Sequence, residues 1–483
     1  MDTILSTTTE VIGTFDQRSV LWALIVGIII AFVLGAAMGG NDVANAFGTS
    51  VGSGVLTIIK AYIFASIFET LGAVLVGWSV TDTMRKGVVD TNQYMSAPKE
   101  LLLGQVAILG GCAAWLLIAT LFRMPVSTTH SIVGATLGFS LVLRGFQGIR
   151  WNAILNIVLS WFLSPSLSGT ISVILYMIVD FVVLRRDNPF ECGLNVLPVF
   201  YFVCVAFNVL MVTWDGSRLL HFNKIPVWGA VLISLGCGFI AAMFVQFFLK
   251  PRIHRKIQDE MESKPKIACV VVNPDLVTDR YIVGKEVKDL EKQSCTSRVR
   301  SFFEWLLPAE RVEDAQTIKL FSTIQVFTAC FAGFAHGAND VGNAIAPLTA
   351  LVAIYKDENA RQEGEVPIYI LLYGVFAICV GLWTMGHRVI RTVGTNMSEI
   401  NPATGFTIEF GAAMTALICS KLGLPISTTH CLVGSVVAVG VVKSRKNIDW
   451  SIFRNIVVSW VVTLPVSCAI SAGIMLLLKL LAL

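Results

Sequence analysis

Long apolar runs, separated by short polar segments, make up most of the chain. Four runs contain no Asp, Glu, Lys or Arg: residues 20–38, 101–122, 194–214 and 226–249. A helix needs about 20 such residues to cross the hydrocarbon core of a bilayer. The runs are too long for barrel strands, and unpaired backbone groups are costly in lipid, so the pattern predicts transmembrane helices.

Further runs extend the same pattern. Residues 58–80, 318–335 and 367–386 come close to spanning length with few charged interruptions. Residues 151–184 and 452–481 are longer, and the proline at the centre of each is expected to break the span. We therefore expect an all-α polytopic membrane protein with 10–12 crossings.

The composition agrees with this prediction. Of 483 residues, 55% are hydrophobic and 14% are charged, and the mean hydropathy is +0.73. Soluble domains carry about 25% charged residues. The low charge excludes a soluble enzyme of this length.

One polar segment, residues 251–315, divides the apolar runs into residues 20–250 and residues 316–483. It begins with basic residues directly after an apolar run, and basic residues beside a span favour the cytoplasmic side. We therefore expect a cytoplasmic loop between two membrane halves. The polar N-terminal segment, residues 1–19, lacks the basic start of a signal peptide.

The two halves are related in sequence. Asn-Asp-Val-x-Asn-Ala occurs at residues 41–46 and 339–344, and Pro-x-Ser-Thr-Thr-His occurs at residues 125–130 and 425–430. A third pair, Asn-Ile-Val-x-Ser-Trp, begins at Asn156 and recurs 299 residues later. Such duplication is typical of secondary transporters, whose site lies between the repeats.

The first motif places Asp42 and Asp340 in apolar, glycine-rich surroundings. A carboxylate at membrane depth indicates a functional site by default. We interpret each as following a helix end, where glycine lets the backbone unwind. The alternative, a surface loop with an Asp cap, does not explain why the pattern occurs twice.

The second motif precedes only about a dozen apolar residues in each half, which is too few to span. We interpret each copy as a re-entrant hairpin with its tip inside the protein. Ser127 and Ser427 then stand at helix N-termini, which favour anions. Simple N-capping is the alternative, and the two roles are compatible. His130 and His430 are interpreted as structural.

A site that combines ligands for a cation with ligands for an anion indicates cotransport. Carboxylate and carbonyl oxygens suit a hard cation such as Na⁺, and N–H and hydroxyl groups suit an oxyanion. Glu69 and Glu409 lie in apolar runs but are not repeat mates, because Leu109 matches Glu409. Each can pair with a cation, carry a proton or serve as a structural donor.

At these residues the chain resembles the inorganic phosphate transporter (PiT) family of Na⁺- or H⁺-coupled symporters. The family signature Gly-Ala-Asn-Asp-Val-x-Asn is complete at residues 337–343, and the first copy has Gly40 in place of Ala. The resemblance covers both halves but not the central loop. It implies two inverted repeats with phosphate and sodium ions bound between them.

The resemblance also implies site residues. The expected phosphate-binding residues are Asp42, Asn45, Ser127, Thr128, Thr129, Asp340, Asn343, Ser427, Thr428 and Thr429. The expected Na⁺ ligands are Asn41, Asp42, Ser127, Asn339, Asp340 and Ser427, and the transport-linked residues are Glu69 and Glu409. No cofactor is expected besides Na⁺ as the coupling ion.

The function expected is Na⁺-coupled phosphate symport by alternating access in the plasma membrane. The partners are phosphate, Na⁺ and the bilayer, with a homodimer as a possible assembly and no nucleic acid. H⁺-coupled phosphate transport and sulfate transport are alternatives within the class, and a channel or receptor is an alternative outside it. No enzyme motif for phosphate-loop, zinc-protease or serine-hydrolase chemistry occurs in the sequence.

Overall fold

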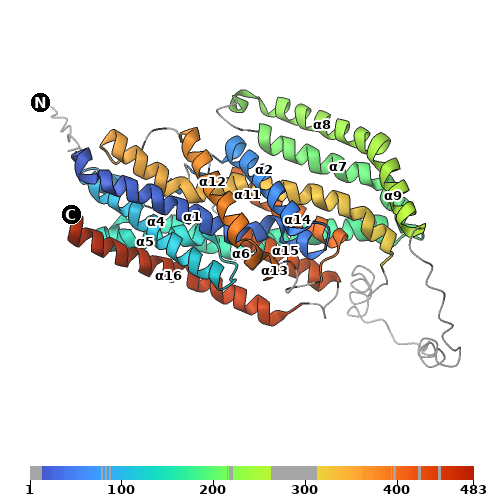
Figure 1. The fold of residues 1–483 in the computed structure, drawn as a ribbon. Coiled ribbons are helices and arrows are strands. Elements are labelled where there is room, and N and C mark those ends of the chain that lie inside the picture. Colours follow the sequence, from blue (N-terminus) through green and yellow to red (C-terminus); the bar gives the residue numbers. More distant parts are fainter. Residues whose placement is uncertain are drawn as a thin grey trace, which may run out of the picture.

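The structure is a computed structural model that describes residues 13–262 and 313–483, apart from short gaps at 78–79, 82–83, 86–88, 215, 217–220, 363, 365, 393, 395–396, 398, 423–425 and 444–447. Long helices packed side by side form the described part (Figure 1). The α-helices are α1 (Gln17–Gly52), α2 (Ile58–Val76), α4 (Pro98–Leu121), α5 (Thr128–Arg144), α6 (Trp151–Val179), α7 (Pro189–Thr213), α8 (Val227–Phe244), α9 (Lys250–Glu262), α11 (Ala315–Asp357), α12 (Ile368–Met385), α13 (His387–Arg391), α14 (Pro402–Lys421), α15 (Thr428–Lys443) and α16 (Trp450–Ala482). Short 3₁₀ turns lie at η1 (Thr91–Tyr94), η2 (Gly145–Gly148) and η4 (Phe222–Lys224), and π-helical turns at η3 (Asp180–Leu184) and η5 (Val245–Leu249).

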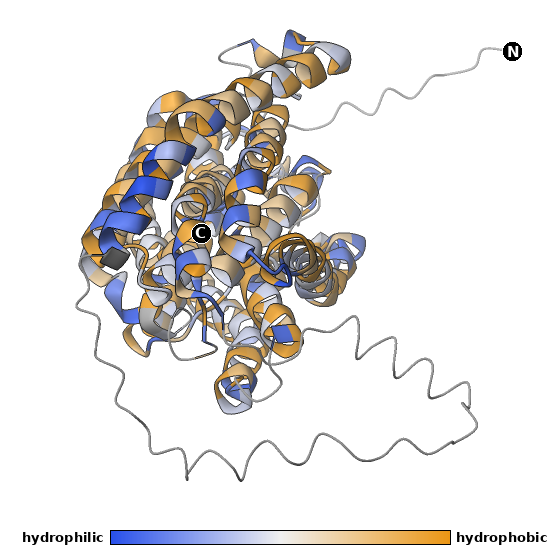
Figure 2. Ribbon diagram, turned by 90° about the vertical axis from the view of Figure 1, so that its right-hand side faces the viewer, coloured by the Kyte–Doolittle hydropathy of each residue, from blue (hydrophilic) through white to orange (hydrophobic). Residues whose placement is uncertain are grey.

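Within the described residues, ten helices are long and apolar enough to cross a membrane. This confirms the all-helical polytopic class and agrees with the expected 10–12 crossings. The α5 and α15 helices are shorter, as the hairpin interpretation requires. Hydrophobic ribbons lie on much of the outside of the bundle when it is viewed nearly along the helices (Figure 2). That surface suits contact with lipid chains.

The prediction that glycine ends the helices before Asp42 and Asp340 was wrong. The α1 and α11 helices continue through both motifs. Glycine instead allows close helix crossings: a Cβ at Gly39 would lie 2.0 Å from the Ile378 carbonyl oxygen, and one at Gly337 would lie 2.1 Å from that of Glu69. The glycines bring backbones together while each helix keeps its own hydrogen bonds.

The predicted breaks at the central prolines were also wrong. The α6 helix continues through Pro165, and α16 continues through Pro465. Membrane helices tolerate proline where neighbouring helices cover the kink. Gly434 of α15 packs against Pro165 in this way, since a Cβ there would lie 2.5 Å from the Pro165 Cα.

The same order of helices occurs twice, once from α1 to α6 and once from α11 to α16. Helices of one set pack against helices of the other. The α1 helix packs against α12 and α11 packs against α2, while α5 packs against α16 and α15 against α6. The α1 and α11 helices run antiparallel, because Gln17 Nε2 donates to the Tyr355 carbonyl at one end and Ser53 Oγ donates to Gln325 Oε1 at the other. This course is compatible with inverted repeats, which stay a prediction.

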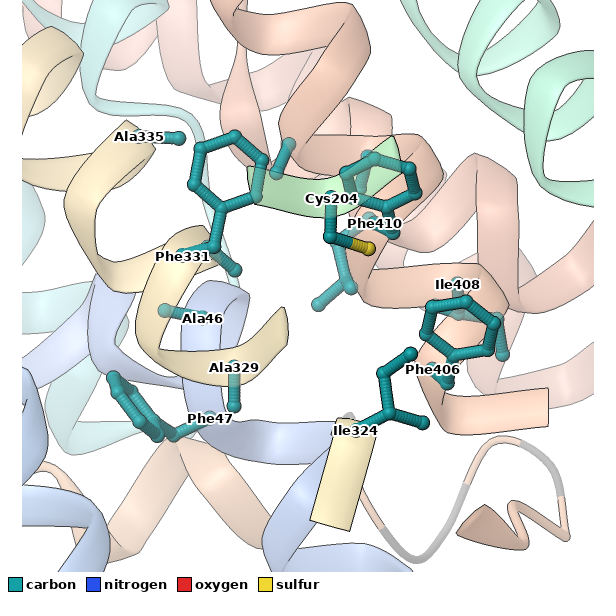
Figure 3. Close-up of a cluster of buried hydrophobic side chains, with 14 of the residues drawn as sticks. Ala46, Phe47, Cys204, Ile324, Ala329, Phe331, Ala335, Phe406, Ile408 and Phe410 are labelled. Carbon is teal, nitrogen blue, oxygen red and sulfur yellow. The ribbon is translucent and has the colours of Figure 1, made fainter. Parts of the chain in front are cut away.

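Aromatic packing holds α14 against α11. Phe331 and Phe410 lie with ring centroids 6.0 Å apart, and Phe406 stacks on Phe410 at 6.3 Å (Figure 3). Because Glu409 is next to Phe410, this apolar cluster fixes the position of a buried carboxylate. The packing thus connects the core to the polar chemistry described below.

The α9 helix continues from α8 through η5 and begins the polar segment. Ile253 and Ile257 are buried, and Glu260 forms an ion pair with Lys319 near the start of α11. The end of α1 and the start of α11 therefore lie at the same end of the bundle as α9. The remaining part of the predicted loop, residues 263–312, lies outside the described residues, and its cytoplasmic position stays a prediction.

Candidate functional site

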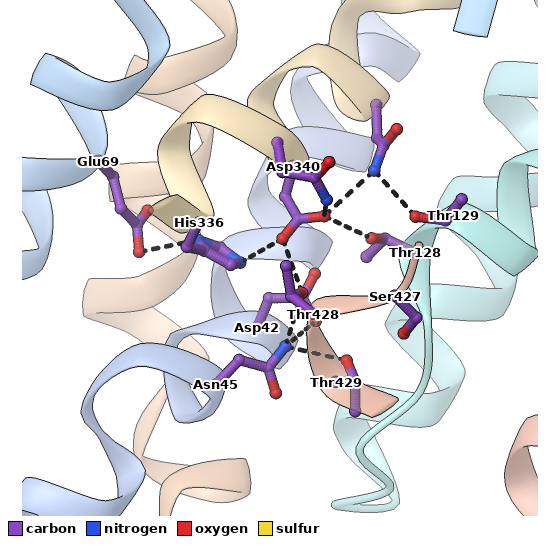
Figure 4. A network of polar contacts seen from close by, with 12 residues as sticks. Asp42, Asn45, Glu69, Thr128, Thr129, His336, Asp340, Ser427, Thr428 and Thr429 are labelled. Carbon is purple, nitrogen blue, oxygen red and sulfur yellow. Dashed lines mark hydrogen bonds and ion pairs between the residues drawn. The ribbon is translucent and has the colours of Figure 1, made fainter. Parts of the chain in front are cut away.

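The carboxylate of Asp340 is buried and joins both hairpin tips (Figure 4). Its Oδ1 accepts hydrogen bonds from Thr128 Oγ1 at 3.3 Å and from Asn343 Nδ2 at 3.1 Å. Its Oδ2 accepts one from Thr428 Oγ1 at 2.9 Å. The structure thus brings together residues predicted from three copies of two motifs, which lie in both halves.

Asn45 and Asn343 occupy matching places in the two halves. Asn45 Nδ2 donates to Asp42 Oδ1 at 3.2 Å and to Thr429 Oγ1 at 2.9 Å. Asn343 Nδ2 donates to Asp340 Oδ1 and to Thr129 Oγ1, both at 3.1 Å. In each motif the Asn therefore bonds both the Asp of its own motif and a threonine of the other half's hairpin tip.

The two tips are tied to each other by reciprocal hydrogen bonds. Thr129 Oγ1 donates to the Ile426 carbonyl, and Thr429 Oγ1 donates to the Val126 carbonyl, both at 3.2 Å. The buried N-termini of α5 and α15 therefore lie at the same centre. The first turn of a helix has N–H groups without intrahelical partners, so these ends favour an anion.

Ser127 and Ser427 act as helix caps. Ser127 Oγ accepts a hydrogen bond from the His130 amide, and Ser427 Oγ accepts one from the His430 amide, both at 3.3 Å. This geometry is the capping alternative considered for both serines. Both side chains are also buried at the tips, so capping leaves their predicted ligand roles open.

In the two Asp–Asn pairs, three buried oxygens have no hydrogen-bond partner among the described residues: Asp42 Oδ2, Asn45 Oδ1 and Asn343 Oδ1. Each is an acceptor without a proton of its own when the carboxylate is ionised. Buried acceptors without donors are costly. Oxygen atoms of this kind are the ligands that a hard cation such as Na⁺ prefers.

His336 is a site residue that the sequence analysis missed. Its Nδ1 lies 3.2 Å from Glu69 Oε1, and its Nε2 lies 3.0 Å from Asp340 Oδ2 (Figure 4). Ligand atoms of Asp42, His336 and Asp340 lie within 4.8 Å of one another. The spacing of His336 and Asp340 by four residues on a helix was the available signal, but Met38 stands at the matching place in the first motif.

Glu409 lies in a separate polar cluster with residues of α1 and α11. Its Oε1 accepts hydrogen bonds from Thr49 Oγ1 and Ser50 Oγ, both at 2.6 Å, and from Gln325 Nε2 at 3.3 Å. Its Oε2 accepts one from Thr328 Oγ1 at 2.8 Å. The structure therefore joins Glu69 to the central site, while Glu409 lies nearer the α9 end.

Asn41 points its amide away from the central cluster. Its Nδ2 donates to Thr120 Oγ1 at 3.1 Å and to the Met124 carbonyl at 2.9 Å, and its Oδ1 accepts from the Val126 amide at 3.1 Å. These contacts hold the segment before α5. Asn339, by contrast, donates to Asp340 Oδ1 at 3.2 Å.

His130 and His430 pack against each other between two tryptophans. Their ring centroids lie 4.6 Å apart, and the His430 ring lies 3.7 Å from that of Trp460. The His130 ring lies 4.9 Å from Trp161. This aromatic stack agrees with the structural interpretation of both histidines.

Comparison with known proteins gives one consistent result. Residues 38–471 match the phosphate transporter family. The chain is 36% identical to sodium-dependent phosphate transporter 1-A of Danio rerio and 33% identical to sodium-dependent phosphate transporter 1 of Rattus norvegicus, with 95% of both chains covered in each case. A solved structure described as the sodium-dependent phosphate transporter is similar with a TM-score of 0.77 and 31% identity, covering 95% of this chain and all of that one.

Proposed function

Because this chain belongs to the phosphate transporter family, we propose that it carries inorganic phosphate across a membrane together with Na⁺. The relatives named above are sodium-dependent phosphate transporters, and the described helices form a multi-pass membrane protein. Neither H⁺ coupling nor sulfate is favoured by these relatives. The single observation that carries the residue-level proposal is Asp340, which contacts both hairpin tips.

Phosphate is proposed to bind between the tips of α5 and α15. Thr128, Thr129, Thr428 and Thr429 supply hydroxyl groups, and the two helix N-termini supply N–H groups and favourable dipoles. Phosphate keeps a proton at neutral pH, and that proton can be donated to a carboxylate. The position of Asp340 beside two of these threonines therefore supports phosphate over sulfate, which has no proton to donate.

Sodium ions are proposed to bind at the Asp–Asn pair of each motif. Asp42 with Asn45, and Asp340 with Asn343, supply carboxylate and amide oxygens on either side of the tips. A cation beside each carboxylate lowers the electrostatic cost of burying the anion, and the anion does the same for the cations. This mutual stabilisation is the physical basis proposed for coupling.

Alternating access is proposed to move the loaded site. Na⁺ binds first and neutralises the carboxylates, and phosphate then enters. The reciprocal bonds of Thr129 and Thr429 keep the tips together around the ligand, and their helix partners, α16 and α6, rearrange to expose the site to the other side. Glu409 is proposed to serve the coupling ion at the α9 end, where hydroxyl groups surround it.

Uptake of radiolabelled phosphate into proteoliposomes tests the function. We expect uptake that requires an inward Na⁺ gradient, is not replaced by K⁺ or a pH gradient, and is insensitive to sulfate. Uptake that follows the pH gradient would assign the coupling to protons instead. Strong sulfate competition would overturn the assignment of the substrate.

The variants Asp340→Asn and Asp42→Asn test the site. Each removes a charge that pairs with the cation, an interaction of several kcal/mol in a buried site, so Na⁺-driven uptake should fall at least about tenfold. The exposed Asp187→Asn is the matched control and should leave uptake unchanged. Normal Na⁺-coupled uptake by Asp340→Asn would contradict the proposed site.

A further inference from the structure

A small polar cavity lies outside the central site, between α4, α5, α11 and the segments around residues 85 and 362. Its volume of about 20 Å³ is enough for about one water molecule. Its polar lining comes from five side chains on four separate parts of the chain: Arg85, Thr91, Gln105, Thr136 and Gln362. Such a concentration of polar groups in an apolar bundle indicates a function.

The walls of the cavity continue directly from the central site. Thr136 lies on α5 two turns beyond Thr129, and Pro347 lies on α11 one turn beyond Asn343. Thr129 and Asn343 are hydrogen-bonded to each other at 3.1 Å, and neither of them lines the cavity. The cavity lies towards the end of α11, away from α9, on the side expected to face outside.

The chemistry of the lining is that of an oxyanion site. Arg85 is 9% exposed, and guanidinium is the protein cation best suited to phosphate. Gln362 is 1% exposed, and neither atom of its amide has a hydrogen-bond partner among the described residues. Its backbone is held in the left-handed region at φ 53°, which is costly for a residue other than glycine.

The two ends of the repeated architecture differ in their buried polar groups. At the places that match Gln105 and Thr136, the second half has Gly405 and Val436. Buried carboxylates lie at the α9 end in Glu409 and in Asp180, which pairs with Arg185, whereas the cavity at the other end has the cationic Arg85. An arginine attracts an anion where it enters, and a carboxylate does not.

We propose that this cavity is the outer part of the phosphate path in its closed form, and that Arg85, Thr136 and Gln362 are the first groups to bind the incoming phosphate. The inference rests on the proposed function and adds an external binding step to it. When α5 and α11 separate at this end, the cavity widens to admit the anion. Phosphate then passes from Arg85 to the tips at Thr129.

The test is the dependence of uptake on external phosphate in Arg85→Gln and Thr136→Val. We expect the apparent KM for phosphate to rise about tenfold in Arg85→Gln, which corresponds to about 1.4 kcal/mol of binding. The maximal rate and the half-saturating Na⁺ concentration should stay within about twofold of the unmodified chain, because the central site is intact. Arg85→Lys should recover part of the affinity, since it keeps the charge but not the planar fork.

Thr136→Val keeps the proposal testable if Arg85→Gln fails to fold. Valine occupies the matching position of α15 at Val436, so the helix pair accepts it. It should raise the KM by a smaller factor, about twofold to threefold, for one lost hydrogen bond. Arg18→Gln, an exposed arginine at the same end of the bundle, is the matched control and should leave the KM unchanged.

Two outcomes would overturn the proposal. Arg85 Nη2 also donates to the Gly364 carbonyl at 3.0 Å, so a purely structural role predicts loss of maximal rate and thermal stability without a change in KM. An unchanged KM in both Arg85→Gln and Thr136→Val would likewise show that these side chains do not bind the incoming phosphate. Absence of phosphate uptake by the unmodified chain would instead refute the proposed function, and this distinguishes the two failures.

Discussion

His336 connects two carboxylates that come from different helices. Glu69 of α2 and Asp340 of α11 both contact its imidazole, and all three side chains are buried. An acid left in the membrane without a partner is costly, because its charge loses both water and its counterpart. The imidazole therefore makes it possible to place Asp340 beside the hairpin tips.

Substitution in pairs tests this role at the residue scale. His336→Met copies the residue at the matching place in the first half, and it should lower the thermal stability of the purified protein, since both acids lose a partner. Glu69→Gln should do the same. The double variant should lose less than the sum, by about 1 kcal/mol or more, because both single changes break the same contact.

Thermal unfolding in detergent measures all three variants, and Asp187→Asn, at an exposed carboxylate outside the cluster, is a suitable control. Strictly additive losses would show that His336 and Glu69 stabilise the protein independently of each other.

At the scale of the element, two glycine crossings set the distance between helices. Gly39 of α1 lies against α12, and Gly337 of α11 lies against α2, each at a distance that leaves no room for a methyl group. The departure of the first motif from the family signature has a related cause. A Cβ at Gly40 would lie 2.8 Å from the Met385 Cβ, so alanine would be crowded there.

Gly337→Ala should therefore lower the free energy of unfolding by about 1–3 kcal/mol or more, because the added methyl group forces the crossing helices apart. Phosphate uptake should fall with it, since Glu69 and His336 would shift. Gly236→Ala in α8 is the control, as no atom lies within 4 Å of a Cβ there. A Gly337→Ala protein as stable as the Gly236→Ala protein would contradict the crossing geometry.

The sequence predicted the spans and the main site residues because both depend on local pattern. Apolar runs identified the helices, and the duplicated motifs identified Asp42, Asp340 and the threonines. The continuity of α1 and α11 could not be predicted, because glycine serves equally in an unwound segment and in a close crossing. The donors around Glu409 and the lining around Arg85 come from distant segments, so only the packing brings them together.

At the scale of the whole molecule, the two halves complete each other. The α1 helix packs on α12, and α11 packs on α2, so each half supplies helix partners for the other. Asp340 of the second half binds Thr128 of the first, and Asn45 of the first binds Thr429 of the second. Neither half contains a complete site.

The chain should therefore work as two co-expressed fragments. Residues 1–290 and 291–483 should copurify and restore Na⁺-dependent phosphate uptake, because the contacts between the halves are non-covalent helix packing and hydrogen bonds. Either fragment alone should show no uptake above that of empty proteoliposomes. Uptake by one fragment alone would contradict a site shared between the halves.

The exchange of partners also has a consequence for synthesis. The ribosome completes α1 at Gly52, but its partner α12 ends only at Met385. At about 5–20 residues per second, the delay is roughly 20 s to a minute. During that time Asn41 already has its partners in α4 and the segment after it, but Asn45 lacks Thr429 and Asp42 lies in an incomplete site. We therefore expect slow translation of the second half to prolong this incomplete state and to reduce the yield of folded protein.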